Sequence, residues 1–133
     1  QGYNLEAEAH FLDGLKITPD HILILLALGR LYISRDQAKA AINVLRQATQ
    51  YQPTFWEAWY QLGRAHMKAR EWNLALSALE QARLYNPDAS EIYNAMASCY
   101  LKTRKKAEAK QMVRESLQRN PNNPEANRLL KQL

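Results

Sequence analysis

The chain has 133 residues, of which 47% are hydrophobic, and a net charge of +5, so it is long enough to bury the core of one domain. Its single cysteine, Cys99, excludes an internal disulfide and a cysteine-rich metal cluster, and a lone thiol favours a reducing, cytoplasmic location. The sequence contains no uninterrupted apolar run of the ~18 residues that a membrane span needs.

Proline recurs in the chain at a fixed interval. Four of the five prolines are evenly spaced: Pro19, Pro53, Pro87 and Pro121. Three other residue types recur with the same period. Alanine recurs at Ala7, Ala41, Ala75 and Ala109. A bulky apolar residue recurs at Phe11, Leu45, Leu79 and Val113, and a small residue recurs at Gly14, Ala48, Ala82 and Ser116. A period of about 34 residues is typical of arrays built from one repeated supersecondary unit.

Each period divides into two segments of about 13 residues with apolar positions at helical spacing, and no alternating β-branched run predicts a strand. The sequence therefore predicts an all-α fold in a single domain, 1–133. In chain order we expect the second helix of a partial unit (1–21, helical from about Tyr3 to Leu15), three complete helix pairs (22–55, 56–89 and 90–123) and a capping or truncated helix (124–133).

The first of these helices lacks a partner, and the residues that follow it are unusually apolar. Ile22, Leu23 and Leu26 occupy positions that should partly face the groove of a regular unit. Either the first helix folds over them or the chain is a fragment of a longer array, and we favour the fragment.

A residue that caps helices well follows each proline. These residues are Asp20, Thr54, Asp88 and Asn122, and glutamate comes three positions after the last three, as Glu57, Glu91 and Glu125. We predict capping boxes, in which the cap side chain accepts from a backbone N–H of the first turn and the glutamate reaches back to the cap.

The sequence resembles the tetratricopeptide repeat family, whose 34-residue unit has the pattern W-x2-L-G-x2-Y, then A-x3-F, then P. The middle unit matches this pattern with Trp59, Leu62, Gly63, His66, Ala75, Leu79 and Pro87. The unit before it matches with Leu25, Leu28, Gly29, Tyr32, Ala41, Leu45 and Pro53. The unit after it matches with Tyr93, Met96, Ala97, Tyr100, Ala109, Val113 and Pro121. The resemblance covers the whole chain and implies a right-handed α-solenoid of stacked antiparallel helix pairs. Gly29, Gly63 and Ala97 should let the two helices of a unit approach closely.

No residue pattern indicates catalysis, a metal or a cofactor. His10, His21 and His66 lack zinc-binding spacing, and no phosphate-binding loop or serine-nucleophile motif is present. His66 stands at the tyrosine position of the repeat, so we expect it to pack. Cys99 lies on an apolar stretch and should be a buried thiol. The sequence predicts a protein that is not an enzyme.

The resemblance implies a function in protein–protein interaction, because in this family the first helices of the units line a concave face that binds peptides or partner helices. Tyr60, Arg64 and Lys68 follow each other at successive helical turns and form one stripe. The equivalent residues are Asn94, Ser98 and Lys102 in the next unit and Leu26, Arg30 and Ser34 in the previous one, and Gln61 lies beside the stripe.

The predicted groove is cationic, with an apolar end near Leu23, Leu26 and Ile33. Arginine can bind a carboxylate through two hydrogen bonds, so Arg30 and Arg64 suggest a peptide or helix with acidic residues, and this chain could be a member of a multiprotein complex. A subset of the family clamps the C-terminal carboxylate of chaperones with lysines and asparagines. The corresponding positions here are Leu26, Arg30, Gln61, Glu91 and Ala95, which disfavours that ligand.

Three other interpretations stay open. The stripe could consist of ordinary solvated residues on an unused face. The segment 102–119 holds seven basic and two acidic residues, and so all of the net charge, and could bind nucleic acid or another anionic surface. Against nucleic acid, Tyr100 is the only nearby aromatic that could stack on bases, and we expect it to pack. The chain could also be the repeat arm of a larger enzyme or complex subunit.

Overall fold

The computed structural model describes residues 2–133, with side chains described from residue 5 onward, and this part of the chain forms eight helices and no strand. In chain order they are α1 (Gly2–Ile17), α2 (Ile22–Ser34), α3 (Ala38–Tyr51), α4 (Trp56–Lys68), α5 (Trp72–Tyr85), α6 (Ser90–Lys102), α7 (Lys106–Arg119) and α8 (Pro124–Leu130). From α2 to α7, the bounds of the helices recur with the same period as the prolines.

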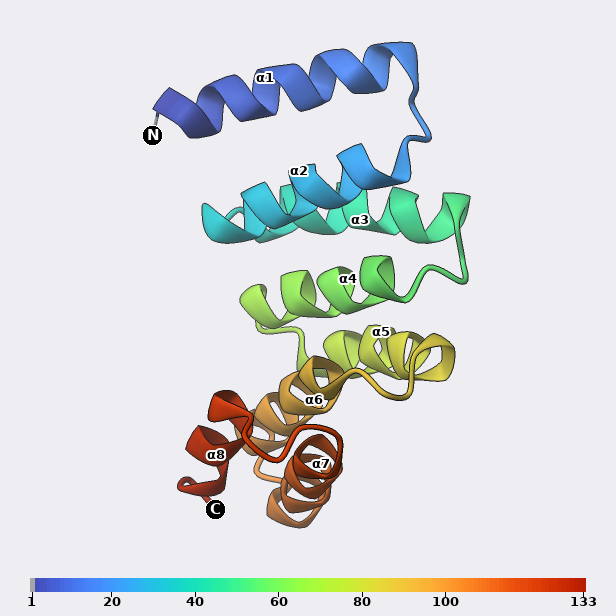
Figure 1. Ribbon diagram of the computed structural model, residues 1–133. Coiled ribbons are helices and arrows are strands. Elements are labelled where there is room, and N and C mark those ends of the chain that lie inside the picture. The colour runs from blue at the N-terminus through green and yellow to red at the C-terminus, as the bar shows by residue number, and fades with distance from the viewer. Residues whose placement is uncertain (1) are drawn as a thin grey trace.

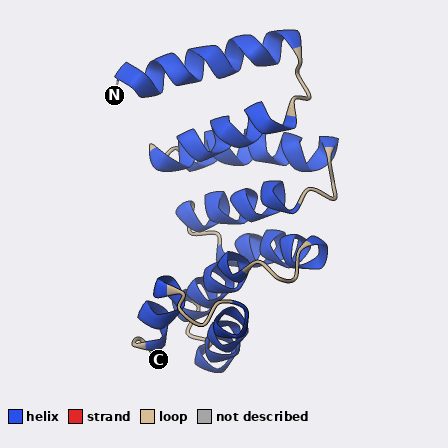
Figure 2. Cartoon of the chain, in the orientation of Figure 1, coloured by secondary structure: helices blue, strands red, loops and turns tan. Residues whose placement is uncertain are grey.

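The helices stack one pair after another, so that the two ends of the chain lie at opposite ends of the molecule (Figure 1). Short turns connect them, and residues 131–133 form a turn after α8 (Figure 2). This arrangement confirms the predicted all-α solenoid. In the described range, none of the helices combines the length and the apolar character that crossing a membrane requires.

Small residues allow the two helices of each pair to touch. A Cβ added to Gly29 would lie 2.5 Å from Leu45 Cγ of the facing helix, and one added to Gly63 would lie 2.8 Å from Leu79 Cγ. The third pair has an alanine, Ala97, at the glycine position, where the facing residue is the smaller Val113. The prediction that these positions set the approach within a pair is therefore confirmed for the first two units.

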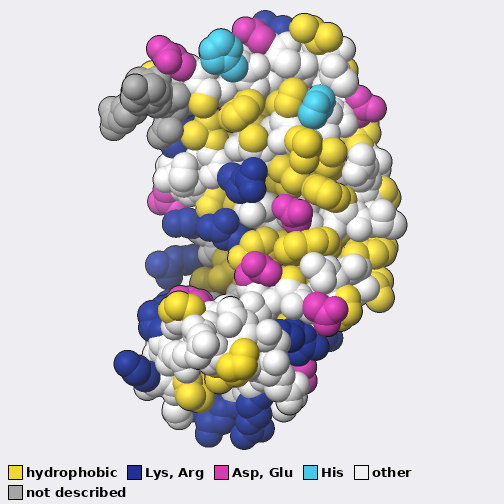
Figure 3. All heavy atoms as spheres, viewed as in Figure 1, with side chains coloured by type: hydrophobic (Ala, Val, Ile, Leu, Met, Phe, Trp, Pro, Cys, Tyr) yellow, Lys and Arg dark blue, Asp and Glu magenta, His cyan; other side chains and the backbone are white. Residues whose placement is uncertain are grey.

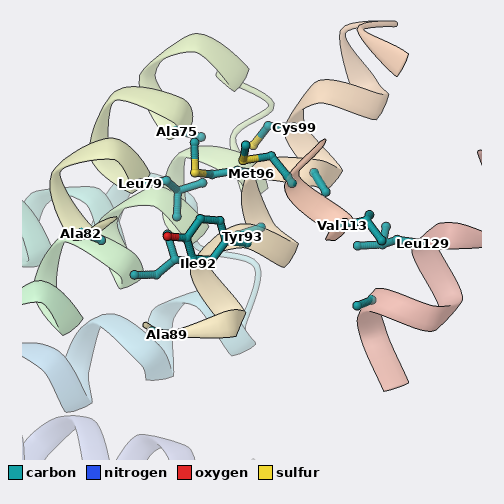
Figure 4. Close-up of a cluster of buried hydrophobic side chains, with 14 residues drawn as sticks. Ala75, Leu79, Ala82, Ala89, Ile92, Tyr93, Met96, Cys99, Val113 and Leu129 are labelled. Atoms are coloured by element: carbon teal, nitrogen blue, oxygen red, sulfur yellow. The ribbon is translucent and has the colours of Figure 1, made fainter. Parts of the chain in front are cut away.

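The core runs from one pair into the next. Leu79 of α5 packs with Ile92 and Met96 of α6, and Val113 of α7 joins the same cluster together with Leu129 of α8 (Figure 4). Cys99 is fully buried in this cluster, as predicted, and burial raises the pKa of its thiol to about 12. His66 is also buried, as predicted for a residue at a tyrosine position. Because each pair shares its core with its neighbours, stability is spread along the stack.

The predicted capping boxes are wrong by one residue. The residues preceding α4, α6 and α8 are Phe55, Ala89 and Asn123, so Thr54, Asp88 and Asn122 lie inside the turns. Two of these turns close through a backbone bond, from Phe55 N–H to Gln52 O and from Asn123 N–H to Asn120 O. Proline starts each turn and its neighbour completes it, so the helix begins one residue later than the cap pattern suggested. Glu57, Glu91 and Glu125 then fall in the first helical turn, where a carboxylate is favoured by the helix dipole.

An aromatic side chain holds the proline turn in two units. Trp59 Nε1 donates a hydrogen bond to Pro53 O, and Tyr93 Oη donates one to Pro87 O; each donor–acceptor distance is 2.7 Å. The two bonds occupy equivalent positions of neighbouring units. The large residue that opens the repeat pattern therefore both packs and satisfies a turn carbonyl.

The turn within each pair has a left-handed residue at its centre. Asp36, Arg70 and Arg104 have φ values of 60°, 60° and 61°, and they occupy equivalent positions in the three units. The next N–H in each case bonds back to the preceding helix, to Tyr32 O, His66 O and Tyr100 O. This geometry costs a residue with a side chain roughly 1–2 kcal/mol. The sequence carries no glycine there, so nothing in it indicated the strain.

Candidate functional site

Two adjoining cavities lie across the first helices of the second and third units. The first, the Tyr60 cavity, has a volume of about 360 Å³ and is lined by Tyr60, Arg64, Met67, Glu91, Asn94, Ala95, Ser98 and Glu125. The second, the Trp72 cavity, has a volume of about 310 Å³ and is lined by Ile33, Arg64, Met67, Lys68, Trp72, Ser98 and Lys102. Three residues line both cavities, so together they form one groove.

The structure brings together six of the eight residues that the sequence predicted for this face. Tyr60, Arg64 and Lys68 from α4 and Asn94, Ser98 and Lys102 from α6 each line at least one cavity. They lie on two neighbouring helices at the same register, which is why the stripe on one helix continues onto the next. Their part in binding stays a prediction.

The other two predicted residues are placed differently. Gln61 is buried, and its Oε1 accepts a hydrogen bond from Arg64 Nη1 at 3.1 Å, so its amide is not presented to the groove. The equivalent positions hold the small residues Ala27 and Ala95, which indicates that this side of the helix packs. Arg30 is exposed on α2 but lines neither cavity.

Asn94 lines the Tyr60 cavity, but its amide is already engaged in a buried network. Its Oδ1 accepts from Ser116 Oγ at 2.6 Å, and its Nδ2 donates to Asn123 Oδ1 at 3.1 Å. Asn123 in turn donates to Ser90 Oγ and accepts from Ala126 N–H at the start of α8. Asn94 therefore joins α6, α7 and α8, a structural role that the sequence did not suggest.

The Trp72 cavity combines an apolar floor with a cationic rim. Ile33, Met67 and Trp72 supply the apolar surface, and Arg64, Lys68 and Lys102 supply the charge. Lys68 and Lys102 stand at the last residue of α4 and α6, where a cation is favoured by the negative end of the helix dipole. In Figure 3, Lys and Arg side chains gather along the left edge of the molecule beside this region.

The Tyr60 cavity has the opposite character on one wall, since Glu91 and Glu125 line it from the first turns of α6 and α8. The pKa of Tyr60 is raised mainly by burial; Arg64 opposes the rise, and the charges of Glu91 and Glu125 add to it. A hydrogen bond from Arg128 lowers the pKa of Glu125, which keeps that carboxyl ionised. The tyrosine hydroxyl is thus protonated and available as a donor or an acceptor.

The apolar end of the groove is not where the sequence placed it. Leu26 is 3% exposed and belongs to the core, while Leu23 is 59% exposed and lines neither cavity; only Ile33 reaches the Trp72 cavity. Met67 and Trp72 were missed as groove residues. One signal was available for Trp72, because the equivalent positions hold Ala38 and Lys106, so its ring is not needed for the repeat itself.

The basic segment 102–119 offers fewer free charges than its composition suggested. Arg119 donates from Nε to Pro87 O at 2.7 Å, lies 4.2 Å from the centre of the Tyr93 ring, and pairs through Nη1 with Glu115 Oε2 at 2.6 Å. This hydrogen bond lowers the pKa of Glu115. Arg104, Lys105, Lys106, Lys110 and Arg114 stay exposed, in the turn before α7 and along that helix.

A family model described as tetratricopeptide repeat matches the chain over residues 33–97 and again over residues 68–133. No curated protein matches the sequence significantly.

Solved structures with the same fold include MamA, with 24% identity and a TM-score of 0.86, over 92% of this chain and 72% of that one. The Cut9–Hcn1 hetero-tetramer of APC/C matches with 25% identity and a TM-score of 0.90, over 98% of this chain and 27% of that one. YrrB, described as having an unusual peptide-binding site, matches with 20% identity and a TM-score of 0.88, over 99% of this chain and 68% of that one. At this level of identity, the likeness to MamA and YrrB is evidence of the fold alone.

Proposed function

The chain belongs to the tetratricopeptide repeat family, and from this membership we propose that it is a non-catalytic scaffold whose groove binds an acidic peptide or helix of a partner protein. Proteins with this fold generally mediate protein–protein interactions. The acidic character of the ligand is the specific part of the proposal.

The observation that carries the proposal is the convergence of Arg64, Lys68 and Lys102 on one cavity. Three cations gathered at one cavity attract carboxylates more strongly than scattered surface charges do, because their positive potentials add. The arginine adds geometry, since its planar group can bind a carboxylate through two parallel hydrogen bonds.

The arrangement of the two cavities supports a peptide or helix as the ligand, because they adjoin each other along the groove. Volumes of about 360 and 310 Å³ lie at the lower end of the range of roughly 300–1,000 Å³ that is typical of small-molecule sites. Each cavity therefore holds one or two side chains, and two adjoining cavities suit successive residues of one segment.

A peptide titration tests the proposal. The probe is a short fluorescein-labelled peptide rich in glutamate, and the control probe has glutamine in place of each glutamate. We expect the wild type to prefer the acidic probe, and Arg64→Glu or Lys68→Glu to weaken its binding by about tenfold or more, measured by fluorescence anisotropy. Lys68 is exposed, so its replacement leaves the packing intact.

The matched control is Arg114→Glu, which reverses an exposed charge of α7 outside both cavities. It should leave binding of the acidic probe unchanged. Equal binding of the two probes, or no effect of either groove variant, would overturn the proposal. If instead Arg114→Glu abolished binding to a single-stranded oligonucleotide that the groove variants still bound, the basic segment of α7 would be the functional surface.

We propose that this chain works in a reducing intracellular compartment and belongs to a multiprotein complex. The only thiol, Cys99, is fully buried within the stack, so its oxidation would disturb the core. Native-extract capture with the wild type and Lys68→Glu, followed by mass spectrometry, would identify partners that depend on the groove.

A further inference from the structure

The two cavities of the groove differ in their chemistry, and a single charged side chain separates them. Arg64 lines both, with the apolar and cationic Trp72 cavity on one side and the Tyr60 cavity, which carries Glu91 and Glu125, on the other. A uniformly acidic segment would complement one of them and be repelled by the carboxylates of the other. The order of charges along the groove therefore constrains the ligand more than its net charge does.

The Trp72 cavity is suited to one apolar side chain. Its floor consists of Ile33, Met67 and Trp72, and its volume of about 310 Å³ leaves room for a leucine or phenylalanine. The cations stand around that floor, so carboxylates that flank the apolar residue would meet Arg64, Lys68 and Lys102. The rigid tryptophan ring supplies contact area at low conformational cost, and the flexible methionine can adapt to the shape of the anchor.

The Tyr60 cavity is suited to a basic side chain. Glu91 is exposed at the start of α6, and Glu125 lines the same cavity from α8. The Tyr60 ring lines the same cavity, and an ammonium group can lie against such a ring. A lysine of the ligand would thus find the exposed carboxylate of Glu91 and an aromatic surface side by side, while the carboxylate of Glu125 is already paired with Arg128.

We propose that the partner segment carries an apolar anchor between acidic residues, which occupies the Trp72 cavity, and a basic residue on one side, which occupies the Tyr60 cavity. This proposal rests on the proposed function, because it assigns the parts of a ligand of the same groove. It adds a specificity rule, called the code below: Trp72 recognises the apolar anchor, and Glu91 recognises the basic residue.

Three fluorescein-labelled peptides test the code. The full probe has one leucine between glutamates and two lysines at one end, and it is made in both orders because the direction of binding is the unknown. The second probe replaces the leucine with alanine, and the third replaces the lysines with glutamine. For one order we expect the wild type to bind the full probe about tenfold more tightly than either of the other two.

The variants separate the two subsites. Trp72→Ala should remove the preference for leucine over alanine and keep the preference for lysine over glutamine. Glu91→Lys should remove or invert the preference for lysine and keep that for leucine. Leu74→Ala, an exposed apolar residue of α5, and Glu108→Lys, an exposed carboxylate of α7, are the matched controls and should change neither preference.

The dependence of the two binding preferences on ionic strength is an independent test of the code. Raising the ionic strength should weaken the preference for lysine, because charge contacts are screened, and leave the preference for leucine nearly unchanged. If Trp72→Ala fails to fold by circular dichroism, Trp72→Gln replaces it, since of the two cavities Trp72 lines the Trp72 cavity alone, whereas Met67 lines both.

The outcomes distinguish the two proposals. If no acidic probe binds, or if Arg64→Glu has no effect, the proposed function fails. If the probes bind through Arg64 but the wild type does not distinguish leucine from alanine and lysine from glutamine, or if Trp72→Ala and Glu91→Lys leave those preferences intact, the code is wrong and the general function stands.

Discussion

The two ends of the stack are attached in different ways. At the N-terminal end, α1 spans 16 residues and keeps Leu5, Leu12 and Ile17 exposed by 65%, 41% and 85%. At the C-terminal end, α8 spans seven residues, yet Ala126 and Leu129 are almost completely buried. A helix as short as α8 is not stable alone in water, so tertiary contacts must hold it. Burial, not helix length, sets how firmly an end is attached.

The buried polar groups are also less completely hydrogen-bonded at the N-terminal end than at the C-terminal end. Glu8 of α1 accepts from Tyr32 Oη at 2.9 Å and from Arg35 Nη1 at 2.6 Å, but Arg35 Nη2 is buried without a hydrogen-bond partner among the described residues. The network of Asn94, Ser116 and Asn123 at the other end satisfies its amides with hydrogen bonds inside the protein. A fully satisfied buried network fixes one arrangement, and a partly satisfied one stabilises less.

The largest effect should come from the apolar contact of α8. Leu129→Ala removes a side chain that is 2% exposed, and we expect a loss of roughly 2–5 kcal/mol in the free energy of unfolding. Chemical denaturation followed by circular dichroism measures it. Leu130→Ala, next to it and 50% exposed, is the control and should cost far less. Equal effects of the two variants would contradict the contrast in burial.

The second effect should come from the polar network of α8. Asn123→Ala leaves Asn94 Nδ2 and Ala126 N–H without their acceptor, and we expect a loss of roughly 1–3 kcal/mol in unfolding free energy. Asn122→Ala, one residue earlier and exposed, should be nearly neutral. If Asn122→Ala proved the more damaging change, the capping position predicted from the sequence would be right after all.

At the N-terminal end we expect a smaller effect that depends on pH. The hydrogen bonds from Arg35 and, second, from Tyr32 lower the pKa of Glu8 in the folded protein. Its stabilising contribution is therefore complete above the ordinary pKa of 4.5 and is lost as the pH falls through the lower, folded value. Glu8→Gln should remove this acid sensitivity from α1, as measured by amide hydrogen exchange at several pH values.

The control at the N-terminal end is Glu6→Gln, since Glu6 is exposed on the same helix. It should leave the pH dependence of exchange in α1 unchanged. Should Glu8→Gln and the wild type lose protection in α1 at the same pH, the ion pair with Arg35 would not be what attaches this helix.

The smallest expected effect is a gain. Arg104 has a left-handed backbone with φ of 61°, so Arg104→Gly should relieve strain and raise the unfolding free energy by about 0.5–1 kcal/mol, after the entropic cost of glycine. The equivalent change at the other end, Asp36→Gly, should gain less, because aspartate tolerates this conformation better. Thermal unfolding of the two variants compares the turns, and a loss of stability in Arg104→Gly would show that its side chain matters more than its backbone.

The fold could be predicted from the sequence because the repeat places the residues that determine it at fixed positions. Gly63 is necessary where Leu79 approaches, and proline ends each pair, so both belong to sets of residues that recur at one interval. The predicted caps of α4, α6 and α8 were wrong by one residue; two of these turns close through a hydrogen bond to a backbone carbonyl, which has no side-chain signature. The left-handed Arg70 was invisible for a similar reason, since arginine has no preference for that conformation.

The groove could be predicted only in part. The stripe of Tyr60 and Arg64 follows from helical periodicity, which fixes the side of the helix on which a residue lies. Gln61 is one position further around the same helix, and the period alone does not say where packing ends. Trp72 begins the second helix of its unit, so a rule that assigns the groove to first helices excludes it.

Asn94 lines the Tyr60 cavity, and at the same time its amide attaches α8. Transient fraying of α8 would remove Asn123 from Asn94 and release that part of the wall, and a ligand that holds Asn94 in place would slow the fraying in return, because such coupling is reciprocal. Binding of a ligand in the groove would then slow amide hydrogen exchange in α8, the last helix of the chain.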